Sequence, residues 1–120
     1  MEFLSLSPFV PSGKDFKSAK AFFVELGFKI LWDGGDYAGM GYGPCTFILQ
    51  QYENESFAQN YMVSVIVSSV EDFRKSVLEK KLPEKYGIRM GNISKQTYGL
   101  EVNIIDKAGV CWHFIEQSDH

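Results

Sequence analysis

Three polar side chains in the last quarter of the chain have types and a spacing that could do chemistry. Glu101 and Asn103 stand two positions apart, and His113 follows on the next predicted strand. Successive side chains of a strand point to opposite faces, so strands at 99–105 and 110–116 place all three on one open sheet face. This trio predicts the polar wall of a binding groove. A solvated sheet face is the alternative, and a lone histidine on a strand is more often a hydrogen-bonded structural residue than a ligand or a base.

The cysteines and serines show no arrangement typical of catalysis. Cys45 and Cys111 stand alone, without CxxC spacing, and are expected to be reduced thiols that pack in the interior. No serine or cysteine has a histidine and a carboxylate in a recognisable arrangement around it. His120 is the last residue and is expected to fray. The sequence therefore predicts no catalytic nucleophile.

The elements that position these residues begin with a first module at about 3–52. Residues 3–11 alternate weakly and contain two prolines, which favours an edge strand or an arm exchanged with another copy. The spacing of apolar residues predicts a helix over 14–26, with a capping box from Ser12 to Asp15 and a stop at Gly27. Three antiparallel strands are predicted to follow, at 28–33, 36–42 and 45–52.

The same order restarts after a polar connector at 53–60. A strand at 61–69 precedes a helix that ends before Pro83 and whose apolar stripe is Val70, Phe73, Val77 and Leu78. Strands follow at 86–94, 99–105 and 110–116. The predicted order of one strand, one helix and three strands thus occurs twice in the chain. We predict an α+β fold in a single domain, 1–120, in which two βαβββ modules (about 3–52 and 61–117) form curved mixed sheets around a cleft. A helix on one face of each sheet leaves the other face free for function.

Strand alternation also predicts which side chains of the second module lie under its helix. The core row is expected to comprise Val63, Val65, Val67, Leu100, Val102, Ile104, Trp112 and Phe114.

Charge and composition exclude several classes of function. The net charge of −3 on 120 residues argues against the basic surface of a nucleic-acid-binding protein and favours cationic partners. Glu2 stands where a signal peptide is basic, and no apolar run reaches the roughly 18 residues of a membrane span. We expect a cytoplasmic protein without nucleic-acid or membrane partners. Aromatic residues form 15% of the chain, more than a core of this size needs, so some are expected to face a ligand.

Longer segments around these residues resemble the vicinal oxygen chelate superfamily, which includes glyoxalase I, extradiol dioxygenases, fosfomycin-modifying enzymes and bleomycin resistance proteins. The doubled module order carries this resemblance, together with FKSAKAFFVELGF and YGLEVNIIDKAGVCWHFIE. Within the superfamily the chain looks most like the bleomycin resistance proteins, whose short motifs are similar to DYAGM at 36–40, QTYGLEV at 96–102 and DKAGVCWHFIE at 106–116. The resemblance covers nearly the whole chain and implies a glyoxalase-like fold.

The resemblance also implies where a metal ion would be held. Enzymes of the superfamily bind one divalent metal ion with His, Gln or Glu from four strands, two in each module. The corresponding residues here are Pro8, Ile48, Met62 and His113, of which only the histidine can coordinate. Because a catalytic divalent site needs about three protein ligands, we predict no metal and no other cofactor.

What the resemblance implies for function is binding without catalysis. Bleomycin resistance proteins are acidic, metal-free cytosolic dimers that sequester a cationic glycopeptide antibiotic in grooves at the dimer interface, and their N-terminal strand can cross to the partner. This chain would then be a homodimer, with N-terminal arm exchange, that sequesters a bleomycin-type or similar planar cationic antibiotic. A small glyoxalase-type enzyme and a small-molecule sensor domain are the alternatives.

The resemblance assigns roles to particular side chains. Tyr37 and Tyr98 match the rings that stack on the ligand, and Trp32 matches an aromatic residue near the groove mouth. Acidic side chains such as Asp33, Asp36 and Glu101 would attract the positive end of the ligand. The complete set of predicted ligand-binding residues is Trp32, Tyr37, Tyr98, Glu101, Asn103 and His113.

Overall fold

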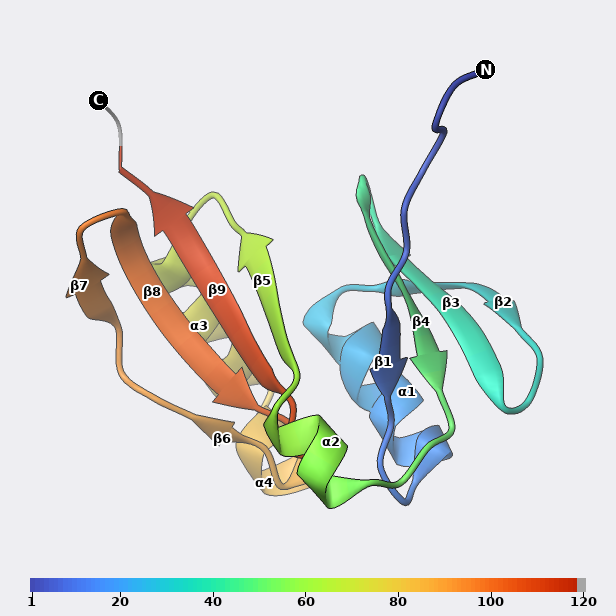
Figure 1. Cartoon of the computed structure of the whole chain (residues 1–120). Coiled ribbons are helices and arrows are strands. Elements are labelled where there is room, and N and C mark those ends of the chain that lie inside the picture. Colours follow the sequence, from blue (N-terminus) through green and yellow to red (C-terminus); the bar gives the residue numbers. More distant parts are fainter. Residues whose placement is uncertain (119–120) are drawn as a thin grey trace. The chain divides into compact units, whose positions relative to one another are not determined.

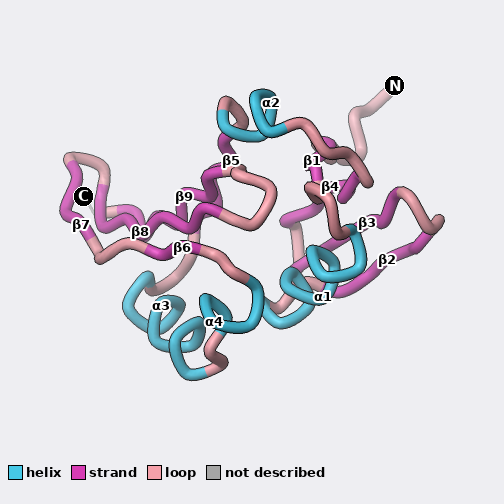
Figure 2. The backbone as a smooth tube through the Cα atoms, turned by 90° about the horizontal axis from the view of Figure 1, so that it is seen from below, coloured by secondary structure: helices cyan, strands magenta, loops and turns pink. Residues whose placement is uncertain are grey.

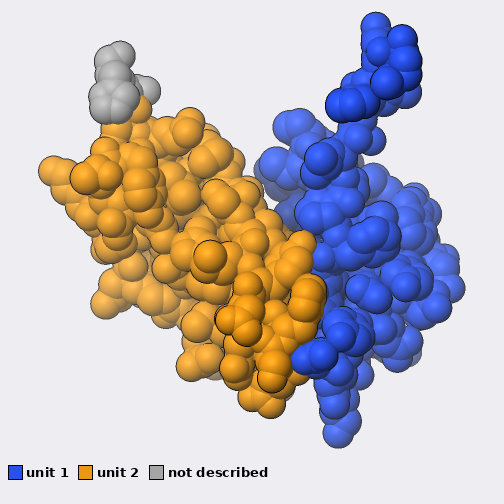
Figure 3. Space-filling view, in the orientation of Figure 1, with its two compact units in different colours: residues 1–54 blue, residues 55–120 orange. Residues whose placement is uncertain are grey.

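The chain, described over residues 1–118 by a computed structural model, consists of two compact units. Unit 1 comprises Met1–Asn54, and unit 2 comprises the chain from Glu55 onward (Figure 3). Residues 119–120, and with them the expectation for His120, lie outside the described part. In each unit a sheet is covered on one face by α-helix, as Figures 1 and 2 show. The other face of each sheet is its open face.

Unit 1 contains a four-stranded sheet with strand order β1-β4-β3-β2. β1 runs parallel to β4, and the other neighbours are antiparallel. β1 is an edge strand, as its prolines predict, but it covers only the last part of the predicted 3–11. The elements are β1 (Phe9–Pro11), α1 (Phe16–Leu26), β2 (Lys29–Asp33), β3 (Tyr37–Tyr42) and β4 (Cys45–Gln50).

The ends of α1 follow from the residue types there. Asp15 is the N-cap and accepts a hydrogen bond from the Ser18 amide at 2.9 Å. The predicted capping box from Ser12 is wrong because the Ser12 amide still donates to the Gln50 carbonyl of β4, which keeps this residue in the extended chain. Gly27 ends the helix as predicted, with a φ of 122° that favours a residue without Cβ.

Unit 2 repeats this topology with additions. Its strand order is β5-β9-β8-β6, with β7 also paired to β8. β5 runs parallel to β9, just as β1 runs parallel to β4, so the first and last strands of each unit are neighbours. The predicted α+β class is confirmed. The elements are α2 (Glu55–Gln59), β5 (Met62–Ile66), α3 (Val70–Glu79), α4 (Leu82–Tyr86), β6 (Arg89–Met90), β7 (Ser94–Gln96), β8 (Gly99–Ile105) and β9 (Cys111–Gln117).

Two predicted segments of unit 2 are wrong in detail. The connector at 53–60, expected to lack regular structure, contains α2, which buries Ala58. The strand expected at 86–94 is replaced by the end of α4 and the short strands β6 and β7. Pro83 stands in the first turn of α4, where its missing amide costs no helical hydrogen bond, so it starts a second helix after ending the first. None of the helices within residues 1–118 is long and apolar enough to cross a membrane.

The core of each unit lies between its helix and its sheet. Leu100 is an exception to the predicted core row, because it lies near the start of β8 and is exposed. The β5 valines are half-buried. The buried apolar residues of the sheets include Val10, Ala38, Met40, Phe47 and Leu49 in unit 1, and Val102, Ile104, Trp112 and Phe114 in unit 2.

A buried carboxylate closes the turn between β8 and β9. Asp106 Oδ1 accepts from the Val110 amide at 3.0 Å, and Oδ2 accepts from Trp112 Nε1 at 2.9 Å. Burial raises the pKa of Asp106, although these hydrogen bonds oppose the shift. The turn at 106–109 therefore fixes β9 against β8.

Gly99 begins β8 at a point where a side chain has no room. Its φ is 142°, and a Cβ there would lie 2.0 Å from the Glu116 carbonyl oxygen of β9. Gly99→Ala is expected to lower the free energy of unfolding by about 3 kcal/mol or more, because a positive φ costs roughly 1–2 kcal/mol and the backbone contact adds to it. Gly35→Ala is the control: its φ is 92°, with no atom within 4 Å. Equal losses in urea unfolding would contradict this expectation.

Candidate functional site

The open face of the unit 2 sheet carries the predicted polar trio. Asn103 of β8 is paired in register with His113 of β9, and Ser64 of β5 is paired with His113 on its other side. The intervening Val102 and Phe114 are buried. The structure thus places Glu101, Asn103 and His113 on one face, as strand alternation predicts. Their role in binding stays a prediction.

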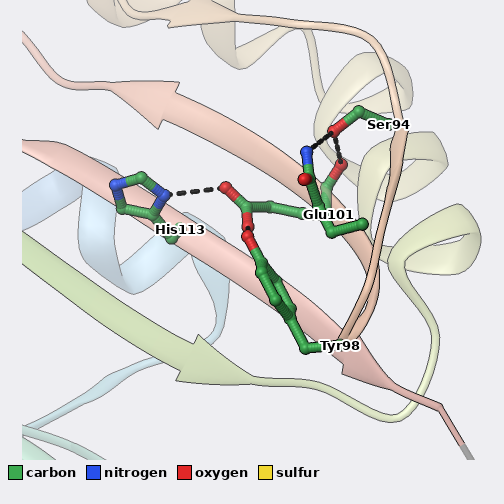
Figure 4. Close-up of polar contacts among 5 residues, drawn as sticks. Ser94, Tyr98, Glu101 and His113 are labelled. Atoms are coloured by element: carbon green, nitrogen blue, oxygen red, sulfur yellow. Dashed lines mark hydrogen bonds and ion pairs between the residues drawn. The ribbon is translucent and has the colours of Figure 1, made fainter.

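Glu101 is the centre of this group and is buried. Only 5% of the residue is exposed. Its Oε2 lies 2.8 Å from His113 Nδ1, and its Oε1 accepts a hydrogen bond from the Tyr98 hydroxyl (Figure 4). The Glu101 carboxylate is therefore covered by two side chains, and its charge lies beneath the open face rather than on the exposed surface.

The contacts of Glu101 keep its carboxyl ionised. The hydrogen bond from Tyr98, then that from His113, lowers the pKa of Glu101, although burial opposes the shift. The hydrogen bond between Tyr98 and Glu101 also raises the pKa of Tyr98, so its phenol stays protonated and acts as a donor. Because an ionised carboxylate can only accept, His113 carries a proton on Nδ1. Nε2 of the ring is turned away from Glu101 (Figure 4).

Asn103 brings a second polar atom to this face. Asn103 is the register partner of His113 and is half-buried. The carbonyl end, Oδ1, is buried and has no hydrogen-bond partner in the described chain. A buried acceptor without a donor costs about 1–3 kcal/mol, so this orphan atom marks a place where an incoming donor would be favoured.

The neighbouring strand β7 supports the turn that carries Tyr98. Ser94 Oγ donates to the Glu101 carbonyl at 3.4 Å and accepts from Gln96 Nε2 at 3.1 Å (Figure 4). These contacts tie β7 to β8 on either side of the turn. Tyr98 itself remains 46% exposed, so its ring is open to a ligand while its hydroxyl is bound to Glu101.

The open face of the unit 1 sheet is aromatic and lined by glycine. On β3, Ala38 and Met40 are buried under α1, so Gly39 and Gly41 face the open side. Trp32 lies against Gly39 so closely that a Cβ there would be 2.2 Å from the indole Nε1. Trp32 is still 48% exposed. The glycines thus let an exposed indole ring rest on the backbone of β3.

Tyr37 lies on the same face, two residues before Gly39. Its ring meets Phe9 edge-on, with 5.9 Å between the ring centroids. Phe9 is paired with Ile48 across β1 and β4. Sequence reasoning did not single out Phe9 or the two glycines. The signals were present, since Phe9 alternates with core residue Val10 and the glycines alternate within β3.

Asp33, expected to attract a cation, is already paired within unit 1. Lys20 Nζ lies 2.5 Å from Asp33 Oδ2, and this hydrogen bond lowers the pKa of Asp33. The Gly35 amide donates to Oδ1 at 2.9 Å. Asp33 therefore ties α1 to β2, whereas Asp36 is exposed.

The six predicted site residues are divided between the two units. Trp32 and Tyr37 lie on the open face of unit 1, and the other four lie together in unit 2. A hollow of about 510 Å³ in unit 1 is lined by none of them; its walls are Lys14, Asp15, Phe16, Lys17, Gly35 and Gln51.

The side chains at the superfamily's metal positions do not fit a metal ion. The register places Phe9, and not Pro8, opposite Ile48, and neither these residues nor Met62 has a hard donor atom. Nδ1 of His113 is hydrogen-bonded to Glu101. Within residues 1–118 no three His, Cys, Asp or Glu side chains are grouped to hold an ion. The free cysteines Cys45 and Cys111 are half-buried.

Comparisons with known proteins identify the fold. No protein-family profile and no curated protein matches the sequence. Solved structures do match. The bleomycin-binding protein of Streptomyces verticillus, solved with copper(II)-bleomycin, is 19% identical, with a TM-score of 0.75 over 98% of this chain and 99% of that one. The bleomycin resistance determinant of transposon Tn5 is 18% identical, with a TM-score of 0.79 over 98% and 100%.

A protein with a metal ion has the same architecture. The fosfomycin resistance protein FosX of Listeria monocytogenes, solved with manganese(II) and sulfate, is 9% identical, with a TM-score of 0.76 over 98% of this chain and 93% of that one. These likenesses establish that the chain has the same fold as these proteins. Proteins with this fold include one solved with an antibiotic and one solved with a metal ion. The fold therefore does not distinguish antibiotic binding from metal binding, and only the side chains of the open faces can do so.

Glu101→Gln is expected to remove part of the pH dependence of folding. Because the pKa of Glu101 is lowered in the folded protein, its contacts stabilise the fold fully above the unfolded pKa and lose this effect as the pH falls through the folded pKa. The wild type should therefore lose more unfolding free energy than Glu101→Gln between neutral pH and about pH 3. At neutral pH the variant should be less stable by about 1–3 kcal/mol.

Urea unfolding across this pH range measures both effects. Asp36→Asn, at an exposed position, is the matched control and should keep the wild-type pH dependence. An identical pH dependence in Glu101→Gln and the wild type would show that the carboxylate does not stabilise the fold.

Proposed function

We propose that this chain is a non-enzymatic binding protein that sequesters a planar, cationic antibiotic of the bleomycin type. The observation that carries this proposal is the chemistry of the open faces, which present exposed aromatic rings and, at Asn103 Oδ1, a buried acceptor without a partner. The fold is that of a bleomycin-binding protein and a bleomycin resistance determinant. We also propose that it acts in the cytoplasm.

The open face of each unit offers aromatic rings as apolar area for a ligand. Trp32 and Tyr98 are about half exposed, and Tyr37 is half-buried beside Phe9. Offset stacking on such rings contributes roughly 0.5–1.5 kcal/mol per ring beyond the burial of apolar area. Planar heteroaromatic ligands can make these stacking contacts, whereas compact polar ligands cannot. The rings therefore favour a flat ligand.

The charge of the chain favours a cationic ligand. The net charge is −3, and a negative surface raises the local concentration and the association rate of cations. Glu101 adds a fixed negative charge beneath the open face of unit 2. A positive group bound above it gains from this charge without displacing Tyr98 or His113.

Titration with copper(II)-bleomycin by calorimetry tests the proposed function. We expect saturable binding by the wild type and about tenfold weaker binding by Trp32→Ala and by Tyr98→Ala, since tenfold corresponds to about 1.4 kcal/mol. Gly39→Ala should weaken binding similarly, because the added Cβ would displace the Trp32 ring. The matched control is Tyr42→Ala, an exposed tyrosine whose ring lies against Phe28 and should leave affinity unchanged.

Two outcomes of this titration would contradict the proposal in different ways. Absence of binding by the folded wild type would remove bleomycin-type antibiotics as ligands. Binding that is unchanged in Tyr98→Ala would remove this ring from the site while leaving the function intact.

We also propose that two copies of the chain associate through the N-terminal segment, with the ligand held at the dimer interface. Large apolar side chains of this segment are almost fully exposed: Phe3 94%, Leu4 87% and Leu6 83%. Such side chains gain by burial against another protein surface. The segment leads directly into edge strand β1, so it is placed to cross to a partner.

A variant with Phe3, Leu4 and Leu6 all replaced by Ser tests this association. It keeps the length of the arm and all of β1, so unit 1 should stay folded, and light scattering should report a monomer where the wild type is a dimer. Ser5→Ala is the control. A dimer that persists in the triple variant would show that the arm is not needed for association.

One observation favours the alternative of a glyoxalase-type enzyme. The carboxylate–imidazole pair of Glu101 and His113, 2.8 Å apart, is an arrangement also used by general bases. Conversion of a bound compound by the wild type but not by His113→Gln would favour catalysis over sequestration. A sensor domain would bind a small molecule without conferring resistance.

A further inference from the structure

Asn103 and His113 together define a property of the ligand that the proposed function leaves open. They are register partners on β8 and β9, so their Cβ atoms are about 4.5–5.5 Å apart. Asn103 Oδ1 is buried and unpaired, and His113 Nε2 is directed away from Glu101 (Figure 4). Two polar atoms of neighbouring strands are thus without a donor from the described chain.

Asn103 Oδ1 is an acceptor, and Nε2 is an acceptor in the neutral form of the His113 ring. Glu101 Oε2 accepts the hydrogen bond from Nδ1, so the proton of that neutral form stays on Nδ1 and Nε2 has a lone pair. Asn103 Oδ1 is buried without a donor. A group with two N–H donors can therefore meet one acceptor on each of two neighbouring strands.

Neighbouring groups on the open face do not neutralise this charge. The Tyr98 hydroxyl is bound to Glu101 as a neutral donor. Burial raises the pKa of the Cys111 thiol, so it stays uncharged. Ser64, the register partner of His113 on β5, is also uncharged. Glu101 therefore supplies a negative charge to the group formed by Tyr98, Glu101, Asn103 and His113.

We infer that Asn103 and His113 form a subsite for a planar cationic donor group of the ligand, of the amidinium or guanidinium class. Such a group carries parallel N–H donors that can serve two adjacent acceptors, and its charge balances that of Glu101. A neutral amide satisfies the acceptors without balancing the charge. A carbonyl compound of the same shape satisfies neither. This inference rests on the proposed function only in taking the open face of unit 2 as a small-molecule surface.

The probe that tests the subsite is benzamidine, compared with benzamide and acetophenone, which have a similar shape. ¹⁵N and ¹H NMR of the intact chain follow the imidazole nitrogens of His113 and the side-chain amide of Asn103. Benzamidine should shift the Nε2 signal and the Asn103 amide signals and bind at least tenfold more tightly than benzamide. Acetophenone should leave these signals in place.

Variants separate the acceptor from the charge. Asn103→Leu removes the unpaired oxygen at similar volume and should weaken benzamidine at least fivefold. Glu101→Gln should reduce the preference for benzamidine over benzamide to near one. Ser64→Ala, on the other side of His113, is the matched control and should bind benzamidine like the wild type. Backbone NMR spectra establish that each variant is folded, and a lower temperature keeps Glu101→Gln folded if it is destabilised.

Two results would overturn the subsite. One is equal binding of benzamidine and acetophenone, and the other is wild-type affinity for benzamidine in folded Asn103→Leu. Failure here is distinct from failure of the proposed function. If copper(II)-bleomycin binds and the His113 signals do not shift, the subsite is wrong and the proposed function stands. If benzamidine binds at His113 and the antibiotic does not bind, the subsite stands and the antibiotic is not the ligand.

Discussion

The charge of a buried carboxylate has to be compensated by hydrogen-bond donors, and in unit 2 this requirement on Glu101 arranges the open face. Tyr98 supplies one donor from the turn before β8, and His113 supplies the other from β9. The turn can approach β9 so closely because Gly99 has no side chain in the way of the Glu116 carbonyl. Asp106 then holds the far end of the same strand pair through Trp112 and the turn amides. Charge, turn and strand register thus depend on one another.

In unit 1 the aromatic rings of the open face are exposed in a different way. Its open face contains no comparable buried charge among the described residues, and its rings are placed by a lack of side chains on β3. Gly39 gives the indole of Trp32 a surface to rest on, and Gly41 does the same for Leu31. The two units therefore share a topology but differ in chemistry. Unit 1 offers apolar area, whereas unit 2 offers acceptors above a fixed negative charge.

At the metal positions that the resemblance implies, this chain has Ile48 and Met62, which carry no hard donor atom, and His113, whose Nδ1 is hydrogen-bonded to Glu101. A carboxylate paired in this way orients an imidazole and sets which nitrogen carries the proton. Such a pair can serve a base in an enzyme, or it can hold an oriented acceptor for a ligand. The group that binds at Nε2 decides between these two uses.

The sequence by itself determined the α+β class, the doubled order of elements and the shared face of Glu101, Asn103 and His113, because strand alternation and helical spacing are local periodic properties. It misplaced the cap of α1 and missed α2 and α4, because capping at Asp15 depends on how far Ser12 follows β4, and short helices have weak periodic signals. Only the tertiary structure decided that Glu101 is buried, that Tyr98 covers it and that Asn103 Oδ1 is left unpaired. Those facts depend on cross-strand neighbours and on the path of the turn at Gly99, which no local pattern specifies.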